Sequence, residues 1–178
     1  MSSGSITEGA QDFSGAKTFQ AGLAAIPGHN TAGLLNIQTA ASGTGADTTE
    51  DTLYTFTLPA NAFSIPGKAV RVRAWGTTGA NGNNKTAKVY FGASVAFASA
   101  TSAANNTPWY FEMIVVKSGA NTQIAHVCGS WNGAIQAPQI FAGSEADGAN
   151  IVIKCTGTNG TAAANDVAGK GFMVEFLN

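Results

Sequence analysis

Charged residues are scarce in this chain. Asp, Glu, Lys and Arg make up 11% of its 178 residues, whereas about 25% is usual in soluble domains. The formal net charge is −1 and no run of Lys or Arg occurs. Nucleic acid is therefore not expected as a partner, because phosphate binding needs clustered cations. A monomer normally keeps charge on its surface for solubility, so the deficit favours a surface largely buried against other subunits over a neutral surface coated with Thr and Asn.

Long apolar runs and signal-peptide features are also lacking. No apolar stretch approaches the ~20 residues that a membrane span requires, so no membrane partner is expected. The N-terminus, MSSGSITEGAQDF, has neither the basic nor the apolar region of a signal peptide, which predicts synthesis and folding in a cytoplasm. The two cysteines, Cys128 and Cys155, fall inside predicted strands. Reducing conditions favour two buried thiols over a disulfide there.

Residues for catalysis and metal binding do not gather in the sequence. His29 lies in a Pro-Gly turn and His126 in a predicted strand, without Cys, His or carboxylate neighbours at the spacing of a zinc site. Ser130 lies near His126 but lacks a G-x-S-x-G elbow and an orienting acid. The few carboxylates fall in predicted loops, where an acid pair for glycoside hydrolysis is not expected. We therefore expect no catalytic residue, no metal ion and no cofactor, in a protein that is not an enzyme.

Period-2 alternation is the dominant pattern in the sequence. It predicts strands over residues 52–58, 69–77, 85–92, 94–98, 108–117, 121–130, 135–142, 150–157 and 170–177. Turn residues separate these runs, and the Asn81-Gly82 pair is typical of a tight type I′ turn. Such a series predicts an all-β fold, an antiparallel β-sandwich of the jelly-roll type.

The strand over residues 69–77 has one apolar face and one cationic, aromatic face. Its alternation places Arg71, Arg73 and Trp75 on the face opposite the apolar residues. In a chain with so little charge, we expect this second face to be partly buried against a neighbouring strand or subunit. The guanidinium groups then need carboxylate or carbonyl partners, because a buried unpaired charge is costly.

Residues 1–50 differ in composition from the remainder of the chain. They are rich in Ser, Gly, Ala and Thr, and 33–39 offers one short strand. Such a segment cannot build its own core, so it is either disordered or an arm that orders against something else, and its widely spaced aromatic anchors favour the arm. The predicted domains are thus an arm over 1–50 and a sandwich over 51–178. The residues expected to contact the partner are the widely spaced apolar anchors Phe13, Phe19, Leu23 and Ile26.

Aromatic residues offer an alternative binding role. Trp75, Trp109, Tyr110 and Trp131 are candidates for a platform on which sugar rings stack, although Trp and Tyr also fill cores and subunit interfaces. Trp109 is expected to be the exposed exception because it follows Pro108 at a strand start. Under this alternative, Trp109 and Tyr110 contact a glycan.

The run DTLYTFTLPANAFSIPGKAVRVRAWGTTGANGNNKTAKVYF, residues 51–91, resembles a group of tailed-bacteriophage virion proteins. In that group a phrase like TLPAN precedes a strand of the R-x-R-A-W-G kind and an N-N-K-T-x-x-x-Y-F-G strand. NIVIKCTG at 150–157 and NDV at 165–167 agree with the same pattern, so that the likeness covers about residues 50–177. FSGAKTFQAGL, at 13–23, looks like a phrase of phage tail-fibre shafts.

The resemblance implies a jelly-roll-like domain, commonly trimeric, with binding or cementing roles and no catalytic residues. A short subunit with an arm and no long shaft is similar to capsid decoration (cement) proteins. The expected function is thus a homotrimeric decoration subunit on the capsid surface of a virion, made in the host bacterial cytoplasm. Its expected partners are its own copies and the major capsid protein, whose capsomers it bridges. The alternative is a tail-fibre or receptor-binding module that recognises host surface glycans.

Overall fold

The computed structural model describes residues 33–178, which form strands and loops. No helix in this part of the chain is long and apolar enough to cross a membrane. The strands are β1 (Gly33–Gln38), β2 (Ser42–Gly43), β3 (Glu50–Leu58), β4 (Ala69–Thr78), β5 (Lys85–Phe91), β6 (Ser94–Ala98), β7 (Pro108–Gly119), β8 (Thr122–Trp131), β9 (Ala134–Gly143), β10 (Ile151–Asn159) and β11 (Val167–Phe176).

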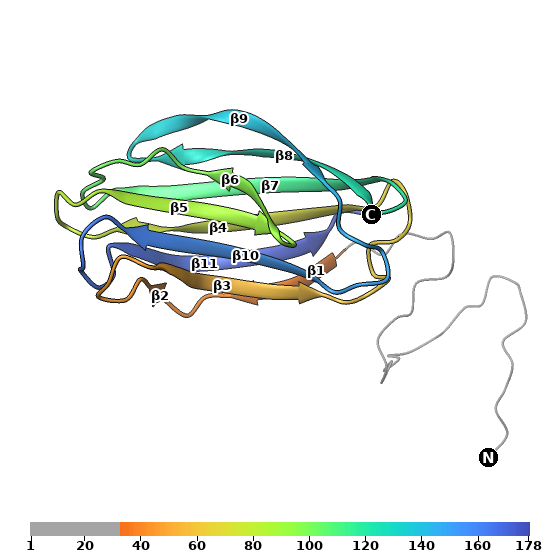
Figure 1. The fold of residues 1–178 in the computed structure, drawn as a ribbon, viewed down its shortest axis with the longest axis horizontal. Helices are drawn as coiled ribbons and strands as arrows, with labels where there is room; N and C mark the ends of the chain where they lie inside the picture. Colours follow the sequence, from red (N-terminus) through yellow and green to blue (C-terminus); the bar gives the residue numbers. More distant parts are fainter. Residues whose placement is uncertain (1–32) are drawn as a thin grey trace, which may run out of the picture.

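The strands form two antiparallel sheets whose inner faces enclose one core (Figure 1). The large sheet has seven strands in the order β1-β11-β4-β7-β8-β9, with β2 also paired to β11, and the small sheet has four in the order β3-β10-β5-β6. The prediction of an all-β antiparallel sandwich is confirmed, and each of the strand ranges expected from alternation overlaps a strand, although several of the ends differ. The jelly-roll subtype stays a prediction.

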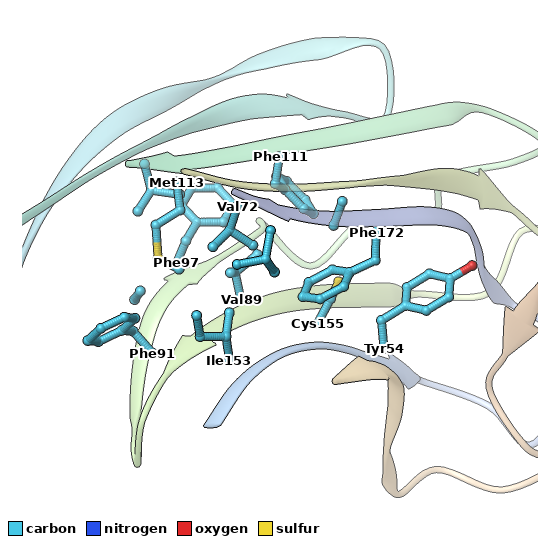
Figure 2. Packing of buried hydrophobic residues seen from close by; sticks show 14 of the residues in the cluster. Tyr54, Val72, Val89, Phe91, Phe97, Phe111, Met113, Ile153, Cys155 and Phe172 are labelled. Atoms are coloured by element: carbon cyan, nitrogen blue, oxygen red, sulfur yellow. The ribbon is translucent and has the colours of Figure 1, made fainter. Parts of the chain in front are cut away.

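The core lies between the two sheets, where alternate side chains of each strand point inward. Figure 2 shows Phe111 and Phe172 of the large sheet facing Phe91 and Ile153 of the small sheet. The rings of Phe97 and Phe111 lie 5.0 Å apart and join the two layers. Burying a side chain of this size contributes about 1.5–3 kcal/mol, so these inward positions supply most of the drive to form the sandwich.

Residues 33–44 belong to the sandwich, which corrects the expected boundary between arm and domain at residue 50. β1 pairs with β11 along the edge of the large sheet, and β2 adds a second short pairing to the same strand. Thr44 continues the contact, because its amide donates to the carbonyl of Val167 at 3.1 Å. This pairing satisfies backbone groups of β11 that would otherwise form an open edge. The arm anchors Phe13, Phe19, Leu23 and Ile26 lie outside the described residues.

Candidate functional site

The outer face of the large sheet, the side turned away from the small sheet, exposes aliphatic side chains. In β7 and β8 the inward partners Val115 and Ala125 are fully buried, while the next positions along each strand, Val116 and Ile124, pair across the outer face and are exposed. Ile140 of β9 stands opposite His126 on the same face and is 73% exposed. The exposed aliphatic residues of this face are Leu34, Ile37, Val116, Ile124, Ile135 and Ile140.

Ion pairs between neighbouring strands occupy the centre of this face. Arg71 of β4 donates to Glu175 of β11 at 3.0 Å, and Arg73 donates to Glu112 of β7 at 2.8 Å. All four side chains are half-buried. The prediction that the guanidinium groups would have carboxylate partners is therefore confirmed, and the central charges are neutralised within the chain.

Glu112 is held ionised by two donors. The hydroxyl of Tyr110 donates to Glu112 at 3.0 Å, beside the bond from Arg73. Burial alone would raise the pKa of Glu112, but the hydrogen bonds from Arg73 and Tyr110 bring that pKa below its usual value. The bond to Glu112 raises the pKa of Arg73 in turn. Arg73 and Glu112 therefore form an ion pair, with both groups charged at neutral pH, at the centre of the face.

The outer face of the small sheet is polar by contrast. Lys88 donates to Glu50 at 2.5 Å, the hydroxyl of Tyr90 also donates to Glu50, and the ammonium of Lys154 lies 4.3 Å from the centre of the Tyr90 ring. Threonines fill many of the neighbouring outward positions of this sheet, among them Thr52, Thr55, Thr57, Thr86 and Thr158. This face also exposes Val95 and Val152, at 42% and 39%, but the exposed aliphatic side chains are more numerous on the outer face of the large sheet.

The structure corrects the expectation that Trp109 is exposed. Trp109 is 1% exposed and stacks on Phe111 in the core, with ring centres 5.5 Å apart. Trp131 is also buried, and its indole N–H donates to the hydroxyl of Ser102 at 2.8 Å. Tyr110 does lie on the outer face, 36% exposed. The predicted glycan pair is therefore divided, because Trp109 and Tyr110 lie on opposite faces of β7.

Trp75 is the tryptophan that accompanies Tyr110 on the outer face. The two residues stand opposite each other in the pairing of β4 with β7. The indole of Trp75 lies against Gly171, where an added Cβ would come within 2.1 Å of the ring. The alternation of β4 in the sequence already placed Trp75 on this face, and only the pairing of β4 with β7 brings it beside Tyr110.

The two cysteines face different surroundings and both are free thiols. Cys155 points into the core from the small sheet, and burial raises its pKa to about 12 (Figure 2). Cys128 is half-buried and stands opposite Glu112 on the outer face of the large sheet. Only one of the two thiols is therefore buried, where two were expected. His126 is exposed on the same face, and within residues 33–178 no three His, Cys, Asp or Glu side chains gather as a metal site requires.

A second polar cluster surrounds Lys85 at one end of the sandwich. Lys85 is only 1% exposed. Its ammonium donates to the side-chain oxygen of Asn81 at 2.8 Å, to the backbone carbonyl of Asn81 at 3.2 Å and to the backbone carbonyl of Asn83 at 2.8 Å. The fully buried carboxylate of Asp166 accepts hydrogen bonds from the side-chain amides of Asn81 and Asn83. The amide of Asn81 therefore links the buried cation to the buried anion.

This cluster corrects the expectation of a tight turn at Asn81-Gly82. The segment connects β4 of the large sheet to β5 of the small one and so is not a hairpin. Asn81 is held by Lys85 and Asp166 instead. A type I′ hairpin geometry occurs at Asn132-Gly133 between β8 and β9, where the φ angles are 51° and 73°.

The loop before β10 is fastened in a similar way. Lys117, whose side chain is fully buried, donates to the carboxylate of Asp147. The amide of Asn121 also donates to this carboxylate, at 3.3 Å. The bond from Lys117 lowers the pKa of Asp147. These clusters fix loops at opposite ends of the strands and leave the outer face of the large sheet as the candidate binding surface.

No protein-family model, curated protein or solved structure matches this chain.

Proposed function

We propose that the protein is a non-enzymatic structural protein of a phage virion, a homotrimeric capsid decoration subunit that bridges neighbouring capsomers on the capsid surface. The observation that carries the proposal is the difference between the two outer faces. The large sheet exposes Ile124, Ile135 and Ile140, whereas the small sheet presents mainly threonines and ion pairs. An exposed aliphatic surface of this kind marks a protein contact.

Two further features support a position on the capsid. The sequence of the sandwich resembles phage virion proteins, and the segment before β1 carries the anchors Phe13, Phe19, Leu23 and Ile26. In a trimer, three such segments bind together, and tethered weak contacts strengthen one another. The proposed partner of these segments is the major capsid protein.

Deletion of residues 1–32 tests this role. The deletion ends there because Gly33 begins β1, which belongs to the large sheet. We expect the shortened chain to remain a folded trimer and to lose its binding to capsids that lack the decoration subunit. The assay is co-sedimentation with such capsids. Unchanged capsid occupancy by the shortened chain would contradict the proposal.

The alternative is a tail-fibre or receptor-binding module for host glycans, which the outward pair of Trp75 and Tyr110 favours. Pyranose rings stack on such side chains, and Glu112 lies within hydrogen-bond reach of the Tyr110 hydroxyl. Glycan-array binding that is lost in Tyr110→Ala and kept in the matched variant Tyr90→Ala, on the small sheet, would favour this alternative. Immunogold labelling of the tail instead of the head would do the same.

A further inference from the structure

The exposed aliphatic residues of the outer face form two flanks at opposite edges of the large sheet. The β1 flank consists of Leu34 and Ile37, which are 56% and 54% exposed. The β9 flank consists of Ile135 and Ile140 of β9 together with Ile124 of β8 and Val116 of β7, the two strands that precede β9 in the strand order. β1 and β9 end the strand order, so five strand spacings of ~4.8 Å separate these edges by ~24 Å. Figure 1 shows β1 and β9 at opposite sides of the molecule.

We propose that copies of this protein contact one another through this face, with the β1 flank of one copy packed against the β9 flank of the next in a closed ring of three. The inference rests on the proposed function, because it names the surface that holds the homotrimer together. In a ring every contact joins two different patches, one from each neighbour, whereas a face-to-face two-fold dimer would pair the same two flanks reciprocally; the number three is taken from the proposed homotrimer. Two separate apolar flanks meet the requirement of a ring.

The charges of the face are compatible with contact between identical copies. Two arginines and two glutamates lie at its centre, and they are paired within the chain as Arg71–Glu175 and Arg73–Glu112. These two pairs therefore bring no net charge into a contact with a second copy. A partner with a strongly charged surface would gain little from these neutralised groups.

The size of the face suits an assembly. Six strands spaced ~4.8 Å apart and about ten residues long, at ~3.3 Å each, give a face of roughly 900 Å². Stable complexes bury about 800 Å² on each partner. In a ring each copy divides this face between two neighbours, so a copy buries roughly 900 Å² only when both contacts form, and one contact alone buries about half of that area.

Single charged substitutions in each flank test the ring. Ile37→Asp alters the β1 flank and Ile140→Asp alters the β9 flank, and both positions point to solvent within one copy. Val152→Asp is the matched control, because Val152 is 39% exposed on the small sheet. The mass of each full-length variant in solution is measured by light scattering after size exclusion, and circular dichroism checks its fold.

We expect three chains for the unaltered protein and for Val152→Asp, and a single chain for each flank variant. Ile140→Asn serves in place of Ile140→Asp if the charged variant does not fold. A mass of one or two chains for the unaltered protein would overturn the inference, as would a flank variant that keeps the mass of three. Capsid binding of the unaltered protein is measured separately. If the flank variants become single chains as expected but the unaltered trimer does not bind capsids, the proposed function is refuted and the inference about the contact face stands.

Discussion

Replacing Asp166 with alanine is expected to cost about 3–5 kcal/mol of unfolding free energy. The carboxylate is fully buried and accepts hydrogen bonds from the amides of Asn81 and Asn83. Each bond to a charged acceptor contributes about 1.5–3 kcal/mol, and removing one member of a buried charged set costs about 3–5 kcal/mol. The substitution removes the buried anion but leaves the buried ammonium of Lys85 in the same cluster, so the positive charge of Lys85 is no longer compensated.

Urea unfolding followed by tryptophan fluorescence measures this loss. With a slope of ~2 kcal/mol per molar urea, the expected decrease in midpoint is ~2 M at an unchanged slope. Lys170→Ala, at an exposed position of β11, is the control and should stay within about 0.5 kcal/mol of the unaltered protein. A decrease below ~0.5 M for Asp166→Ala would refute the account of Asp166 as a buried carboxylate whose hydrogen bonds to Asn81 and Asn83 stabilise the fold.

The link through Asn81 predicts that Lys85 and Asp166 are energetically coupled. A double-mutant cycle with Lys85→Met and Asp166→Asn isolates this coupling. The double variant should lose less than the sum of the single losses, by about 0.5–3 kcal/mol, because neither charge is then left alone. Strict additivity would show that the amide of Asn81 transmits nothing between them.

Three other predictions concern packing, pH and thiol access. Gly76→Ala should destabilise the protein by about 3 kcal/mol in thermal melts. The added Cβ would lie 1.9 Å from the carbonyl oxygen of Ala168 and 2.6 Å from the Trp109 ring. The control Gly82→Ala should be neutral, because a Cβ there has no atom within 4 Å. The pKa of Glu112 in the folded protein is lower than its usual 4.5. The ionised side chain therefore stabilises the fold above pH 4.5, and this stabilisation is lost as the pH falls through the folded pKa. Glu112→Gln should lose less stability on acidification than the unaltered protein, and an unchanged acid profile would contradict this. In the flank variant Ile140→Asp, expected to be a single chain, one thiol, Cys128, should react with a disulfide reagent at pH 8, and the buried Cys155 should react only after unfolding.

The strands were predictable because their signal is local. Most of the strands, such as β4, β5 and β7, alternate inward and outward residues along their length, and turn residues separate the strands. The same alternation predicts the burial of Trp109, because Trp109 lies two and four residues before Phe111 and Met113 and so points to the same buried face of the strand. The proline before it suggested exposure, but the packing of one whole face of β7 outweighed its position at the strand start.

The pairing of residues 33–44 with β11 could not be read from their composition. β1 is an edge strand whose residues are mostly exposed, so its sequence lacks a buried apolar face. Its hydrogen bonds go to the backbone of β11, and backbone groups carry no sequence signal. The Lys85 cluster escaped prediction for a related reason, since Asn81 and Asp166 are joined only by the tertiary fold.

The outer face of the large sheet shows what composition alone cannot say. Low charge could simply reflect a chain rich in threonine, and the outer face of the small sheet is indeed coated with Thr55, Thr57 and Thr86. The same chain places isoleucines at Ile135 and Ile140, where they are 87% and 73% exposed. Both outer faces belong to the same threonine-rich chain, and threonine is favourable in strands. Threonine would therefore also be suitable at the positions of Ile135 and Ile140. The exposed isoleucines of the large sheet therefore support the proposal that this face is covered by other copies of the chain.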